Sequence, residues 1–217
     1  MEKYFLLFMG YSVLGWIIEV IGKFITKGRF INRGFLIGPY CPIYGSGALL
    51  MTLLLTRYVD DKFVLFIMAI VLCSVLEYVT SFVMEKMFHI RWWDYSNYKF
   101  NINGRICLET MIPFGILGVL AISYINPLVF EFFDRISIGT LRFCSIVLLI
   151  LYIVDNILSF RIICGLNDIT ENIKSDSTEK VTAQVKKVII DGNKALYSRL
   201  IMAFPRIQII KKLKKIK

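Results

Sequence analysis

The chain has 217 residues, of which 57% are hydrophobic, with a mean hydropathy of +0.65 and a formal net charge of +10. Soluble domains average about 45–50% apolar residues, so this composition excludes an ordinary soluble domain and indicates an integral membrane protein. The positive charge lies mostly beside the apolar runs, where it sets topology and attracts anionic lipid. We therefore expect membrane lipids, and no nucleic acid, among the partners.

Five apolar runs are long enough to cross a bilayer, at residues 4–22, 36–56, 63–83, 106–125 and 141–162. Each is close to the ~20 residues that an untilted transmembrane helix needs. The first run carries Glu19 and has neither a basic n-region nor a small-residue cleavage site, so we expect a retained helix rather than a signal peptide. The predicted fold is an all-α integral membrane protein with about five transmembrane helices and a cytosolic helical tail.

The distribution of positive charge predicts the orientation. Loops 23–35 and 84–105 and the tail after residue 161 hold most of the 26 lysines and arginines. Because such loops stay in the cytoplasm, we expect a multi-pass plasma-membrane protein with its N-terminus outside and its C-terminus in the cytoplasm. The predicted domains are a transmembrane domain over residues 1–165 and a cytosolic, amphipathic and basic tail over residues 166–217.

The second run contains helix-breaking residues at membrane depth. Residues 32–47 read NRGFLIGPYCPIYGSG, with four glycines and two prolines. A helix limited to residues 43–56 would measure ~21 Å, less than the ~30 Å of a bilayer core. We therefore expect residues 35–42 to lie in the membrane as an extended or re-entrant segment, a kinked continuous helix being the alternative. Non-helical backbone at this depth must be buried in protein or line a wet cavity, and such segments often line substrate sites.

Four acidic residues fall at a matching depth in the cytoplasmic half of the membrane: Glu19, Glu77, Glu109 and Asp155. Glu19 and Glu109 each have a basic residue four positions away, so a structural ion pair is an alternative reading for both. Glu77 and Asp155 have no basic residue one turn away on their own helix. An unpaired carboxylate in a membrane is costly, so these two should face a partner helix or a cavity.

Further polar residues gather near these acids. Glu77, Ser81 and Glu85 recur every four residues and form one stripe on the third predicted helix. The loop that follows is rich in Trp, Tyr, Asn and Arg. Its Trp and Tyr residues can alternatively be interfacial anchors, and residues 101–105 can alternatively be a helix cap and turn. We predict a cytoplasm-facing polar pocket formed by Glu19, Asn32, Arg33, Tyr40, Tyr44, Glu77, Glu85, Trp93, Asp94, Asn101, Asn103, Arg105, Glu109 and Asp155.

Five blocks of the sequence carry a family resemblance: NRGFL at 32–36, GPYCPIYG at 38–45, LEY at 76–78, WWDY at 92–95 and NINGR at 101–105. Together they resemble the bacterial family described as "putative ABC-transporter type IV", over about residues 5 to 125. The resemblance implies an ABC transporter permease with several spans. The chain has no GxxxxGK[ST] loop to hold ATP, so such a permease would need a separate ATPase subunit and a second copy of itself.

The favoured function is therefore membrane transport, with Arg33 and Arg105 complementing an anionic substrate. The first alternative is a membrane-embedded enzyme acting on a lipid or amphiphile, with Glu77, Asp94 and His89 among its acid–base groups. We place it second, expecting no enzyme activity, because no nucleophile–base pair stands out. The five scattered cysteines and single histidine predict neither a metal site nor a cofactor. The second alternative is a scaffold or regulatory subunit acting through residues 167–217.

Overall fold

The computed structural model describes residues 1–28, 32, 34, 36–88 and 91–175. The predictions for Arg33, His89 and the tail after residue 175 fall outside these residues. The elements in chain order are α1 (Glu2–Lys27), α2 (Pro42–Leu55), the 3-10 turn η1 (Thr56–Tyr58), α3 (Lys62–Phe88), β1 (Asn101–Ile102), β2 (Ile106–Cys107), α4 (Leu108–Leu120), the π-helical turn η2 (Ala121–Ile125), α5 (Asn126–Asp134) and α6 (Ile138–Ser175).

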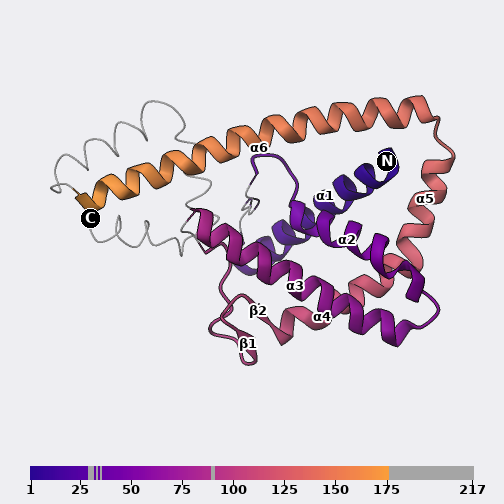
Figure 1. Cartoon of the computed structure of the whole chain (residues 1–217), viewed down its shortest axis with the longest axis horizontal. Helices are drawn as coiled ribbons and strands as arrows, with labels where there is room; N and C mark the ends of the chain where they lie inside the picture. Colours follow the sequence, from indigo (N-terminus) through magenta and orange to yellow (C-terminus); the bar gives the residue numbers. More distant parts are fainter. Residues whose placement is uncertain (29–31, 33, 35, 89–90, 176–217) are drawn as a thin grey trace.

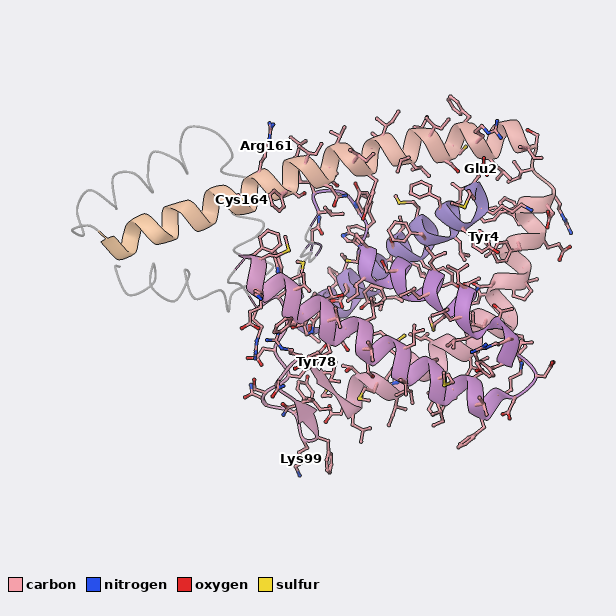
Figure 2. The ribbon with its side chains drawn as sticks, in the orientation of Figure 1. Glu2, Tyr4, Tyr78, Lys99, Arg161 and Cys164 are labelled. Atoms are coloured by element: carbon pink, nitrogen blue, oxygen red, sulfur yellow. The ribbon has the colours of Figure 1, made fainter. Side chains whose placement is uncertain are left out.

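Four helical stretches of the described chain are long and apolar enough to cross a membrane: Glu2–Thr26, Lys62–Phe88, Leu108–Asp134 and Ile138–Arg161. This confirms the prediction of an all-α membrane protein. In Figure 1, α6 runs along one side of the bundle, and the N-terminus lies near α5 and the start of α6. The β1–β2 hairpin lies toward the opposite end, which we call the loop end. Figure 2 places Glu2 and Tyr4 at the N-terminal end and Tyr78 and Lys99 toward the loop end.

The second predicted span is helical over only part of its length. Its helix, α2, has 14 residues and begins at Pro42, and residues 36–41 before it are not helical. Cys41 has an extended backbone (φ −118°, ψ 96°), as expected for the residue before a proline. Proline at the first helical position has no amide whose hydrogen bond could be lost. The structure therefore has a bent, non-helical segment here, and not the alternative of a kinked continuous helix.

The third spanning stretch is bent where α4 gives way to α5. The turn at Ala121–Ile125 is π-helical, and Pro127 is the second residue of α5 (Asn126–Asp134). Bends of this kind arise at prolines and π-turns, and Figure 1 shows α4 and α5 meeting at an angle. The bend leaves the side chain of Asn126 inside the bundle, where it is 4% exposed.

Two glycines allow α1 and α2 to pack closely. A Cβ at Gly45 would lie 2.3 Å from the carbonyl oxygen of Phe8, and one at Gly15 would lie 2.3 Å from the ring of Tyr44. Small residues permit this close approach between membrane helices. At the start of α2 the backbone amide of Cys41 donates a hydrogen bond of 2.8 Å to the carbonyl oxygen of Ser12. The non-helical segment is therefore held against α1, and the ring of Tyr44 on α2 packs against α1 at Gly15.

The last helix, α6, continues without a break from Ile138 to Ser175. It crosses residue 165, where the domain boundary was predicted, so no helix end marks that boundary. The side chains of Phe143, Ile150 and Leu151 on α6 are more than half exposed. An exposed apolar surface of this extent is what a membrane-facing helix requires.

Candidate functional site

Asp155 on α6 holds the non-helical segment in place. Its Oδ1 accepts hydrogen bonds from the amide of Ile37 (2.9 Å) and from Ser159 Oγ (2.8 Å). Its Oδ2 accepts from the amide of Gly38 (2.7 Å) and the hydroxyl of Tyr40 (2.5 Å). Backbone amides at membrane depth need such acceptors because no water is present to replace them. Asp155 and Tyr40, both predicted for the pocket, thus fasten the segment that replaces a helix.

Asn32 fastens the beginning of the same segment. Its Oδ1 accepts hydrogen bonds from the indole N–H of Trp16 (2.8 Å) and the amide of Gly34 (3.1 Å). Its Nδ2 donates to the carbonyl oxygen of Ile37 at 3.3 Å. A side chain that bonds its own backbone two residues on is typical of Asn in turns. The role of Asn32 in the structure is therefore to order the approach to the broken span.

A cavity of about 740 Å³ lies between α1, α2, α3 and the loop that precedes β1. The α3 residues that line it are Cys73, Leu76, Glu77, Thr80 and Met84, a spacing that keeps them on one face of the helix. Five of the predicted pocket residues line it: Glu19, Tyr44, Glu77, Trp93 and Asp94. The cavity therefore lies between the start of α2 and the α3 face that carries Glu77, while Ser81 and Glu85 of the predicted stripe do not line it.

Two of the carboxylates that line this cavity, Glu19 and Glu77, lie on spanning helices, and each accepts a hydrogen bond from a tyrosine. The hydroxyl of Tyr44 on α2 donates to Glu19 Oε1 on α1 at 2.8 Å. The hydroxyl of Tyr95, in the loop, donates to Glu77 Oε1 on α3 at 3.1 Å. Burial and the nearby Glu77 raise the pKa of Tyr95 well above its usual range, so this phenol keeps its proton and remains a donor. Glu77 is 7% exposed, and its Oε2 has no hydrogen-bond partner among the described residues.

The loop end is closed by an ion-pair network beside the cavity. Arg105 pairs with Glu85 at 2.8 Å, and Arg91 lies 3.3 Å from Glu85 and 3.4 Å from Asp94. Arg105 also donates to Ser81 Oγ at 3.2 Å. The stripe Ser81–Glu85 thus anchors the loop to α3. Arg105, proposed from sequence to bind an anion, is already occupied by these partners and does not appear among the residues that line the described cavity.

Asn101 and Asn103 shape the hairpin itself. Asn103 and Gly104 both have positive φ, 53° and 66°, a conformation that Asn and Gly tolerate best. Asn101 Oδ1 accepts from the amide of Gly104 at 2.9 Å, and Asn103 Nδ2 donates to the hydroxyl of Tyr78 at 2.9 Å. Residues 101–105 therefore form a turn, which was the alternative interpretation of this part of the sequence.

The last predicted pocket residue, Glu109, lies at the start of α4, and its side chain is exposed. No hydrogen bond or ion pair involves it within the described part of the chain, so the alternative of a pair with Arg105 is not found. Arg33 lies outside the described residues. In the same described ranges, no three His, Cys, Asp or Glu side chains are placed to hold a metal ion.

Sequence reasoning missed a second buried polar group. The hydroxyl of Tyr11 donates to Asn126 Oδ1 at 2.7 Å, and Asn126 Nδ2 donates to Thr52 Oγ1 at 2.9 Å. This links α1, α5 and α2 where Tyr11 and Ile125 line the cavity. Asn126 follows the predicted span 106–125 directly, so it looked like a residue at the membrane surface. Tyr95, the partner of Glu77, stood in the WWDY block but carried no charge to single it out.

Comparison with known families agrees with the five sequence blocks. The model of the family described as "putative ABC-transporter type IV" matches residues 6–160. It extends past residue 125, where the resemblance was expected to end, and so includes Asp155 as well as the cavity. No curated protein and no solved structure matches the chain.

Proposed function

Because the chain belongs to the family described as "putative ABC-transporter type IV", we propose that it is the membrane-embedded permease component of a transport system. The transported molecule binds in the cavity beside Glu19 and Glu77. One observation carries this proposal: a cavity of about 740 Å³ brings two carboxylates together among membrane-spanning helices. Such acids are rare in spanning segments and usually mark a substrate or ion pathway.

The cavity walls fit a transport site better than a structural core. One wall includes the first residues of α2, directly after the segment whose helix is broken. Binding sites of many transporters lie at helices interrupted in this way. The loop end supplies Trp93, Asp94 and Tyr95 to the opposite wall. We propose that this end faces the cytoplasm, as the positive charge of its loops predicts, with the N-terminus outside.

The energy source under this proposal is a separate ATPase, since the sequence has no loop to hold ATP. We expect the ATPase to contact the loop end, and a second copy of the chain to complete the permease. Purification of the full-length chain from its own cells in mild detergent, followed by mass spectrometry, should recover an ATPase subunit. Turnover of a lipid by the purified chain without any ATPase would instead identify it as a membrane-embedded enzyme.

The role of the cavity is tested by complementation. Cells lacking the gene are compared with cells carrying the wild type, Glu77→Gln or Glu109→Gln, and metabolites in cells and medium are measured by mass spectrometry. We expect the wild type and Glu109→Gln to restore the metabolite that the deletion changes, and Glu77→Gln to fail at equal abundance in the membrane. Glu109 is the matched control because its carboxylate is exposed and outside the cavity. Full restoration by Glu77→Gln would contradict the proposal.

A further inference from the structure

Glu77 is a buried carboxylate that the protein satisfies only by half. It is 7% exposed, and Tyr95 donates to Oε1 while Oε2 has no partner among the described residues. An acceptor that is buried and left without a donor loses its hydration without compensation, and a buried charge loses much more. Oε2 is therefore placed to accept a hydrogen bond from a molecule that enters the cavity.

The cations near the cavity are already engaged. Arg91 is shared between Glu85 and Asp94, and Arg105 pairs with Glu85. Lys23, at the end of α1, also has a partner. Among the described residues, none of these positive side chains pairs with Glu77. A donor that also brings positive charge must then come from the ligand, which is the opposite of the anionic substrate expected from sequence.

Most of the remaining lining of the cavity is apolar or aromatic. Its aliphatic lining includes Leu14, Ile18, Leu36, Leu76 and Leu117. Its aromatic lining includes Tyr44, Trp92, Trp93, Tyr95, Tyr98 and Phe114. The faces of such rings attract cations. A volume of about 740 Å³ lies within the ~300–1,000 Å³ of pockets that hold drug-sized ligands.

We propose that the cavity binds an amphiphilic amine, whose ammonium group donates a hydrogen bond to Glu77 Oε2 while its apolar body lies among the aliphatic and aromatic walls. This inference rests on the proposed function, because it names the class of molecule that the permease binds. The amine is either a free amphiphile or the head group of a membrane lipid, since both present the same ammonium chemistry to Glu77.

The test uses three probes that differ only in the head group: 4-phenylbutylamine, 4-phenylbutan-1-ol and 4-phenylbutanoate. Each is titrated at pH 7 by calorimetry into the full chain in phosphatidylcholine nanodiscs, and the heat with empty nanodiscs is subtracted. The amine and the alcohol can both donate a hydrogen bond to Glu77, but only the amine brings a positive charge to the carboxylate, so the amine should bind at least about tenfold more tightly than the other two probes. Equal affinity for the amine and the alcohol would overturn the proposal.

Variants tie the preference to Glu77. Glu77→Gln should lose the preference for the amine and keep its affinity for the alcohol, which also shows that the cavity is intact. Glu109→Gln should behave as the wild type. If Glu77→Gln binds no probe, Glu77→Asp, which restores the charge, must still prefer the amine. A preference that persists in Glu77→Gln, or disappears in Glu77→Asp, would overturn the proposal.

Two further comparisons separate the possible outcomes. Nanodiscs containing phosphatidylethanolamine should weaken binding of the probe if the ligand is a lipid head group, and leave it unchanged if the ligand is a free amine. A preference for the amine without a transport defect in Glu77→Gln would overturn the permease assignment and leave the amine site standing. A transport defect in Glu77→Gln, with no preference for the amine in the wild type, would overturn the amine site alone.

Discussion

Asp155 and Glu77 are two intramembrane carboxylates that the sequence treated alike. Each is at least nine-tenths buried, and neither has a basic residue one turn away on its own helix. Asp155 accepts hydrogen bonds from four donors, two of them backbone amides of the segment that replaces a helix. Glu77 accepts one, from Tyr95. The hydrogen bonds of Asp155 give it a structural role, whereas the unsatisfied oxygen of Glu77 is the reason that we propose Glu77 for binding.

The largest effect on stability is expected from Asp155→Ala. This change leaves the amide of Gly38 and the hydroxyl of Tyr40 without their acceptor, and leaves the amide of Ile37 with the longer bond to Ser159 Oγ at 3.2 Å. Each of these two buried donors left without an acceptor costs about 1–3 kcal/mol, so the free energy of unfolding should fall by about 2–6 kcal/mol. Thermal unfolding in detergent measures the loss. Asp155→Asn keeps one acceptor oxygen and should lose less, and equal stability of Asp155→Ala and the wild type would remove the distinction between the two acids.

A smaller loss of stability is expected from Gly38→Ala, because the added methyl group crowds the hydrogen bonds of Asp155 to Gly38 and Tyr40. A Cβ at Gly38 would lie 2.5 Å from the ring of Tyr40 and 2.9 Å from Asp155 Oδ2. Crowding of this kind costs about 1–3 kcal/mol. Gly22→Ala is the control, because nothing lies within 4 Å of a Cβ there, and in a helix it should be neutral or stabilising by up to about 1 kcal/mol. If both variants unfold at the same temperature, Gly38 is not packed tightly against Tyr40 and Asp155.

The smallest effect is expected at Asn126, which is buried and uncharged and has a hydrogen-bond partner at both its oxygen and its nitrogen. Asn126→Leu removes the hydrogen bonds to Tyr11 and Thr52. Hydrogen bonds between membrane helices average about 0.6 kcal/mol each, so the free energy of unfolding should fall by about 1 kcal/mol. The preference for the amine probe should not change, since Asn126 does not line the described cavity. A loss of that preference would extend the binding site beyond Glu77.

Much of the fold could be predicted from local patterns in the sequence. Four of the five apolar runs coincide with helices of the described chain that are long enough to cross a membrane. The prolines at 39 and 42 marked the place where the second predicted span is not helical. Helix length alone led to the expectation that residues 35–42 lie at membrane depth. These features depend on residues close together in the chain, so no knowledge of the tertiary structure was needed.

The partners of the charged residues could not be predicted, because they come from distant segments. Nothing near Asp155 in sequence pointed to the amides of Ile37 and Gly38, more than 100 residues away. Arg105 was expected in the pocket, but the hairpin turns it toward Glu85 and Ser81. The side chain that completes the site, Tyr95, is uncharged and was one of many aromatic residues in its loop. Charge and depth found the candidate acids, and only the tertiary contacts separated their roles.

The most direct test measures affinity for the amine and thermal unfolding on the same preparations of Glu77→Gln and Asp155→Ala. We expect Glu77→Gln to lose about tenfold or more in affinity for 4-phenylbutylamine while its free energy of unfolding stays within about 1 kcal/mol of the wild type. Asp155→Ala should show the large loss of stability. A Glu77→Gln protein that unfolds as readily as Asp155→Ala and still binds the amine as the wild type does would contradict the account.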